Sequence, residues 1–135
     1  MPSGQFNLGV LFATKGMDAE ANAAFDRARE ALKTFDRPHL LPSKVALYKG
    51  RVLFNMKRFE EAETEVRTFL SSKPTHEDGQ LLLGAILEAS GRRDDALQYY
   101  RSILGSSHKW RPTFRATVEV AIARILAENE SREIS

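Results

Sequence analysis

Histidine and carboxylate side chains are the residues of this chain that could do chemistry as metal ligands or general acids and bases. The three histidines, at positions 39, 76 and 108, stand in expected linkers or at a helix start, with no partner pattern around them. The densest group is His76-Glu77-Asp78, but contiguous residues at a helix start point in different directions. The sequence therefore predicts no enzyme, no metal and no cofactor. Together with Thr75 the segment resembles a capping box.

Three charged stretches remain as candidates for binding. The runs Glu60-Glu61-Ala62-Glu63 and Arg92-Arg93-Asp94-Asp95 stand at expected helix starts, where acids favour the helix dipole, so we interpret them as solvated structure. The third, His108-Lys109-Trp110-Arg111, combines bases with the only tryptophan. It could touch a nucleic acid or an acidic partner, and the alternative is that Trp110 packs over the end of the helices.

Composition excludes several classes of protein. The chain has 135 residues, of which 42% are hydrophobic and 28% charged, with a net charge of +2, as expected for one domain with an ordinary core. Near neutrality makes nucleic-acid binding and membrane attraction poor hypotheses. There is no cysteine, no apolar run that could span a membrane and no recognisable signal peptide. By default we expect a cytoplasmic protein.

The elements that must position any site are helices. Apolar residues recur at helical spacing, and Gly16, Pro38, Pro74, Gly91 and Gly105 end the periodic stretches. This pattern predicts an all-α chain of seven antiparallel helices and no strand. The expected ranges are 5–15, 18–35, 44–56, 59–72, 76–90, 93–104 and 112–129.

A 34-residue period organises these helices. Gly50 and Gly84 are 34 residues apart, and so are Ala62 and Ala96. The same small residues occur once more upstream, where Gly9 precedes Gly50 by 41 residues. We assign the seven extra residues, about two helical turns, to the end of the second helix. A fixed period of this length is typical of a helical repeat array.

The unit resembles the tetratricopeptide repeat, through Leu8-Gly9 with Ala21, Phe59-Glu60-Glu61-Ala62 with Pro74, and Leu83-Gly84 with Ala96 and Tyr100. The resemblance implies a right-handed α-α superhelix and a single domain over residues 1–135. Its repeats would span about 3–38, 43–76 and 77–110, with a capping helix at about 112–130. Glycine and alanine would stand where the two helices of a repeat cross, and the first helices would line a concave inner face.

By the same resemblance, the inward positions of the first helices form a groove for a peptide or partner segment. In the third repeat these positions are Asp78, Leu81, Ala85, Glu88 and Ala89. The groove would be apolar with bases beside it, although some of these residues could pack against the array or the cap. The candidate partner-binding residues are Phe6, Val10, Lys44, Leu47, Arg51, Phe54, Asn55, Leu81 and Glu88.

The chaperone carboxylate clamp of some family members is absent. Its Lys, Asn and Arg positions correspond here to Phe6, Val10, Tyr48, Asp78 and Leu82. We therefore expect an adaptor or scaffold that binds a protein without this clamp. The alternative is a structural subunit of a larger assembly or a homo-oligomer, pairing through the convex face, the cap helix or the array ends. RNA binding is the weaker third hypothesis.

Overall fold

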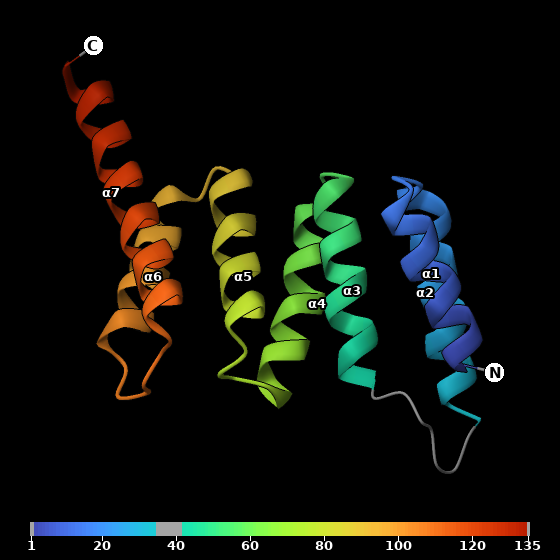
Figure 1. Cartoon of the computed structure of the whole chain (residues 1–135). Helices are drawn as coiled ribbons and strands as arrows, with labels where there is room; N and C mark the ends of the chain where they lie inside the picture. The colour runs from blue at the N-terminus through green and yellow to red at the C-terminus, as the bar shows by residue number, and fades with distance from the viewer. Residues whose placement is uncertain (1, 35–41, 135) are drawn as a thin grey trace. The chain divides into compact units, whose positions relative to one another are not determined.

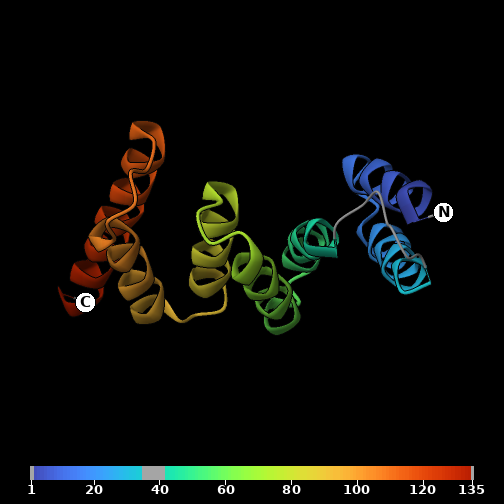
Figure 2. The same cartoon turned by 90° about the horizontal axis from the view of Figure 1, so that it is seen from below.

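The computed structural model describes residues 2–34 and 42–134, and all the regular structure in these ranges is helical. Figures 1 and 2 show neighbouring helices paired as antiparallel hairpins, α1 with α2, α3 with α4, and α5 with α6. The predicted all-α fold is confirmed. The helices are α1 (Pro2–Thr14), α2 (Asp18–Leu32), α3 (Pro42–Asn55), α4 (Phe59–Ser72), α5 (Glu77–Ala89), α6 (Arg93–Gly105) and α7 (Pro112–Ile134).

Two helix ends differ from the sequence prediction. Helix α7 continues to Ile134, beyond the expected 129, because no glycine or proline interrupts it after Pro112. Helix α2 has 15 residues, only one more than α4, so the predicted two-turn extension of α2 is wrong. At the end of the helix the last carbonyls accept short-range bonds, among them Thr34 Oγ1 to the Ala31 carbonyl at 2.9 Å. Most of the extra residues therefore lie between Leu32 and Pro42, and 35–41 are outside the described ranges.

The turns inside the three hairpins share one backbone conformation. A residue with positive φ follows each first helix: Gly16 at 76°, Lys57 at 62° and Gly91 at 83°. In each turn an N–H bonds a carbonyl five residues earlier: Met17 to Phe12 at 2.8 Å, Arg58 to Leu53 at 2.9 Å and Arg92 to Leu87 at 3.0 Å. These are the closing bonds of a Schellman motif. The turns are 41 and 34 residues apart, and the same two intervals separate Gly9, Gly50 and Gly84 in the sequence.

The glycines mark the closest helix crossings, as the repeat pattern predicts. A Cβ on Gly9 would stand 2.5 Å from the ring of Phe25, and one on Gly50 would stand 2.7 Å from Val66 Cγ2. A Cβ on Gly84 would overlap the ring of Tyr100. The alanines of the period, Ala21, Ala62 and Ala96, have no exposed surface. Small residues therefore let each pair of helices approach, and large buried ones fill the space beside the crossing.

The chain forms two compact units, residues 1–74 and 75–135. The first has a core around Phe6, Phe25 and Tyr48, whose rings lie 5.1 to 6.2 Å apart. In the second, α7 buries one face that includes Phe114, Val118 and Ile125, and it contacts α6. Each unit thus has its own hydrophobic core.

Candidate functional site

A groove runs between α5 and α7 in the second unit. It contains a hollow of about 370 Å³ and a smaller one of about 150 Å³. All five inward positions that the sequence predicts on α5 line it: Ala85, Glu88 and Ala89 the larger hollow, Asp78 and Leu81 the smaller. The opposite wall is formed by α7 residues, among them Thr113, Thr117, Arg124 and Glu128.

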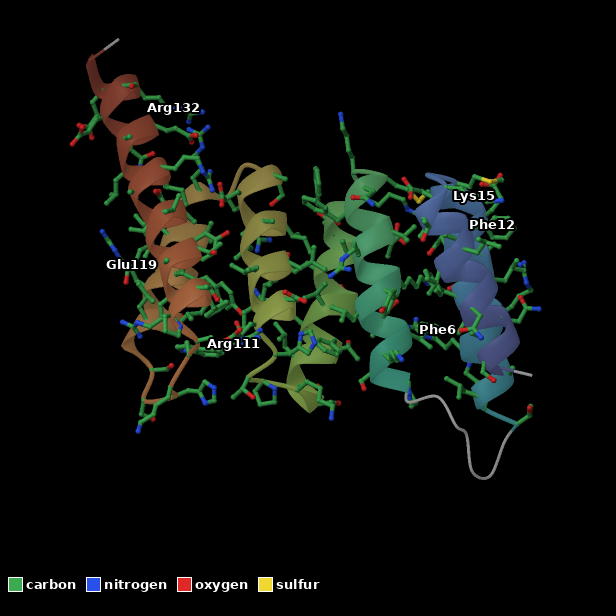
Figure 3. The ribbon with its side chains drawn as sticks, viewed as in Figure 1. Phe6, Phe12, Lys15, Arg111, Glu119 and Arg132 are labelled. Atoms are coloured by element: carbon green, nitrogen blue, oxygen red, sulfur yellow. The ribbon has the colours of Figure 1, made fainter. Side chains whose placement is uncertain are left out.

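An ion pair crosses this groove at the end where α5 and α7 begin. The Glu77 carboxylate of α5 accepts hydrogen bonds from the Arg111 backbone N–H at 3.0 Å and from Arg111 Nε at 2.6 Å, just before α7. These bonds hold the pKa of Glu77 below its ordinary value. Arg111, labelled in Figure 3, thereby fixes the start of α7 beside the start of α5.

A second set of polar contacts crosses the groove at its other end. Glu88 on α5 accepts hydrogen bonds from the Tyr100 hydroxyl at 2.9 Å and from Arg124 Nη1 at 2.5 Å. Burial would raise the pKa of Glu88, but the bonds from Arg124 and Tyr100 outweigh it and leave the pKa below its ordinary value. Arg93 on α6 pairs with Glu128 on α7 at 3.2 Å. The spacing of α5 and α7 is therefore fixed at both ends.

In the first unit the candidate residues divide by burial. Phe6 and Leu47 keep only 6% and 8% of their surface exposed, and Val10 packs against the core that contains Phe6. Packing is thus the role that the structure gives Phe6, which is the alternative left open by its sequence. Figure 3 shows Phe6 on α1, on the side of α3.

The accessible candidates of this unit lie on α3. Lys44, Arg51 and Asn55 are exposed, and Phe54 is half-buried beside Phe59 at a ring distance of 5.9 Å. Lys44 Nζ lies 5.4 Å from the ring centre of Phe6, a cation–π distance. These α3 candidates therefore present two cations and one aromatic edge to solvent.

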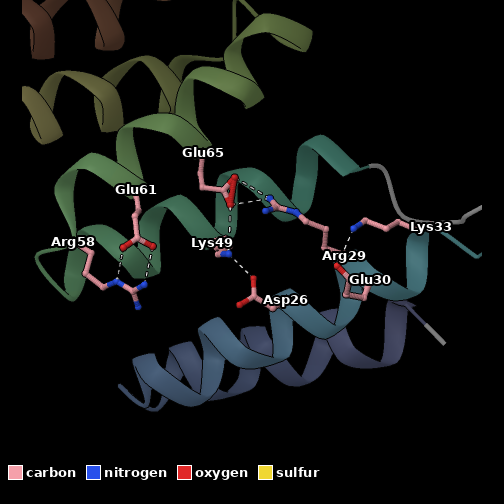
Figure 4. Close-up of polar contacts among 8 residues, drawn as sticks. All are labelled: Asp26, Arg29, Glu30, Lys33, Lys49, Arg58, Glu61 and Glu65. Atoms are coloured by element: carbon pink, nitrogen blue, oxygen red, sulfur yellow. Dashed lines mark hydrogen bonds and ion pairs between the residues drawn. The ribbon is translucent and has the colours of Figure 1, made fainter.

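A partly buried charge cluster was not predicted. Lys49, on α3, pairs with Asp26 on α2 and lies 3.8 Å from Glu65 on α4. Arg29 Nη2 also reaches both carboxylate oxygens of Glu65, as Figure 4 shows. The contact with Oε1, at 2.9 Å, is a hydrogen bond, whereas the contact with Oε2, at 2.8 Å, is an ion-pair contact only. The sign of this cluster in the sequence is Lys49, a charged residue at a position where the family that the chain resembles has leucine.

Two segments that the sequence singled out prove to be structural. His76 caps α5, and its Nδ1 accepts a hydrogen bond from the Gly79 N–H at 3.1 Å, so the cap is His76 rather than Thr75. Trp110 is 8% exposed and donates to the Ile103 carbonyl at 3.0 Å. The packing interpretation of Trp110 is therefore confirmed.

Metal binding and membrane spanning find no support in residues 2–34 and 42–134. Over these ranges no three His, Asp or Glu side chains gather where they could hold a metal ion. The helices described there are too short or too polar to cross a bilayer.

A family model described as tetratricopeptide repeat matches residues 47–108. The chain matches none of the curated proteins. Among solved structures, two titled MamA, of AMB-1 and MSR-1, have TM-scores of 0.71 and 0.73 and 19% identity over 98% of this chain. The chain spans 66% and 70% of their lengths. The first such domain of Spaghetti (RPAP3), bound to the HSP90 peptide SRMEEVD, has a TM-score of 0.70 and 16% identity, covering 96% of this chain and 93% of its own. At these identities the similarity concerns the fold.

Proposed function

We propose that this chain, whose residues 47–108 match a tetratricopeptide repeat model, is an adaptor that binds a peptide or partner segment along its inner helix faces. The main support for this proposal is the groove between α5 and α7. The inward positions of the third repeat line it, as the family pattern implies. Its walls are held by ion pairs at both ends, so a ligand would meet a preformed site and little ordering would oppose binding.

The lining indicates what the groove would accept. Ala85 and Ala89 are small, so the larger hollow has room for a side chain of the ligand. Its other lining residues are charged (Glu88, Arg93, Arg124 and Glu128), so a polar group of the ligand would fit there. Asp78, beside the smaller hollow, is exposed and forms no ion pair in the ranges 2–34 and 42–134. A basic group of the ligand would complement it. The α3 face, with Lys44 and Arg51, would instead attract an acidic group.

The clamp for a C-terminal carboxylate is not part of this proposal. The Spaghetti domain binds a peptide with an acidic end, but Phe6 and Leu82, at two clamp positions here, are buried and apolar. We therefore expect the peptide SRMEEVD not to bind this chain.

A selection from random short peptides, followed by titration of the selected peptide, tests the proposal. Fluorescence anisotropy would compare the wild type with Ala89→Trp, which fills the larger hollow. Gln98→Trp, at an exposed site on α6, is the matched control. We expect at least about tenfold weaker binding for Ala89→Trp, since a blocked pocket typically costs more than 1.4 kcal/mol. If all three proteins bind the peptide with equal affinity, and circular dichroism shows each to be fully helical, the proposal that the groove binds the peptide is wrong.

The second candidate function is a structural subunit or homo-oligomer. One observation favours it: α7 exposes Val120 at 66% and Leu126 at 38% of their surface. In this case the cap helix would be an interface.

A further inference from the structure

Helix α7 is apolar on two opposite faces. One face, with Phe114, Val118, Ala121 and Ile125, is buried. The other face repeats the same spacing with Ala116, Val120, Ala123 and Ala127, and all four are exposed. An apolar stripe on the solvent side of a helix is a candidate contact face for a partner.

The equivalent exposed stripes of α4 and α6 are polar. The same intervals along α4 select Glu60, Thr64, Arg67 and Ser71, and along α6 they select Asp94, Gln98, Arg101 and Gly105. Neither set contains an apolar residue other than glycine. The uncharged face of α7 therefore differs from the solvent faces of α4 and α6, and Val120, at 66%, is more exposed than the other large apolar residues described.

The spacing of this stripe is symmetric. Its intervals of four, three and four residues read the same from either end. An antiparallel two-fold axis midway between Val120 and Ala123 places Ala116 level with Ala127 of a second copy. It also places Val120 level with Ala123 of that copy. Alanine permits close approach of two helices, and each valine would then pack against an alanine.

The charges beside the stripe fit the same two-fold axis. Arg115 and Glu130 lie on one edge of the stripe, and their side chains form no ion pair in the ranges 2–34 and 42–134. The axis brings Arg115 within two residues of the level of Glu130 of the second copy, about 3 Å along the helix. Glu119, which points away from the unit in Figure 3, would lie beside Leu126 of the second copy.

We propose that the exposed face of α7 docks a second copy of this chain as an antiparallel, two-fold symmetric helix pair. Its centre is Val120 against Ala123, and two ion pairs between Arg115 and Glu130 fix the register. A single helix face is small beside typical stable interfaces of about 1,200–2,000 Å². The dimer is therefore weak and concentration-dependent. It uses residues outside the groove between α5 and α7, so it stands independently of peptide binding.

Sedimentation velocity of the full chain tests the association, in a series from low micromolar to several hundred micromolar protein. The wild type is expected to shift from monomer to dimer, and Val120→Glu is expected to weaken dimerisation at least about tenfold, because it buries an unpaired charge. Gln98→Glu, with the same added charge on α6, should dimerise as the wild type does. A wild type that stays monomeric throughout overturns the proposal, and so does a Val120→Glu variant that dimerises normally.

Single cysteines test the register, because the chain has no cysteine of its own. A mixture of the variants Ala116→Cys and Ala127→Cys should form a disulfide-linked heterodimer under mild oxidation, while each variant alone should not. Linkage of Ala116→Cys to itself would show a parallel pair and overturn the antiparallel arrangement. Arg115→Glu should lose dimer, and adding Glu130→Arg in the same chain should restore it. Failure of this rescue would overturn the proposed ion pairs.

Discussion

Replacing Gly84 by alanine should destabilise the second unit, against the usual preference of helices for alanine. The added methyl group would overlap the ring of Tyr100. That ring cannot move freely, because Tyr100 is 3% exposed and its hydroxyl donates to Glu88 at 2.9 Å. The substitution must therefore strain the crossing of α5 and α6 or release Tyr100 from Glu88.

The magnitude follows from three contributions. Overpacking costs about 1–3 kcal/mol. Release of the tyrosine would remove a hydrogen bond to a charged acceptor, worth about 1.5–3 kcal/mol. Helix propensity returns about 1 kcal/mol. Because strain and release are alternatives, we expect a net loss of about 1–2 kcal/mol in the free energy of unfolding.

Gly4 supplies the matched control for this experiment. It lies in α1, and a Cβ there would have no neighbour within 4 Å, so Gly4→Ala should leave stability unchanged or raise it by up to about 1 kcal/mol. Urea unfolding followed by circular dichroism would compare both variants with the wild type. A Gly84→Ala protein as stable as the wild type would refute the close-crossing account.

Four further expectations come from other parts of the structure. Lys57→Gly should stabilise the chain by about 1 kcal/mol in urea unfolding, because Lys57 holds a φ of 62°. Glu65→Ala should cost about 2 kcal/mol in urea unfolding, because it removes the hydrogen-bond acceptor of Arg29 and the second carboxylate near Lys49, which keeps Asp26. Glu65→Gln, which keeps an acceptor oxygen for Arg29, should cost less, and equal losses would contradict this role of Glu65. Burial and Glu88 raise the pKa of Tyr100. Since the unfolded chain loses this proton near pH 10 and the folded chain does so only at higher pH, stability should fall as pH rises above about 10, and less so in Tyr100→Phe. The peptide SRMEEVD should show no saturable binding in isothermal titration calorimetry.

The fold could be predicted because its determinants are local and repeated. Gly9, Gly50 and Gly84 are required wherever two helices cross closely, and that requirement is visible as a period in the sequence. The extension of α2 was predicted wrongly because the spacing from Gly9 to Gly50 counts inserted residues but does not place them. Helical propensity alone did not show that the helix ends at Leu32.

The site was only partly predictable for a different reason. Family register predicted that Ala85 and Glu88 share the inner face of α5, and both line the larger hollow, but contacts between helices decide what a side chain is free to do. Register gives no sign that Glu88 is held by Arg124 of α7. It likewise gives no sign that Phe6 is buried, because burial depends on how Tyr48 and Phe25 pack around it.

Nuclear magnetic resonance would test the central claim most directly, by titrating the labelled chain with a selected peptide. If the groove binds the peptide, amide shifts should change at Ala85, Ala89 and Thr117, while Gln98, at an exposed site on α6, stays unchanged. Shift changes confined to α4 and α6, with Ala85 and Ala89 unaffected, would contradict it.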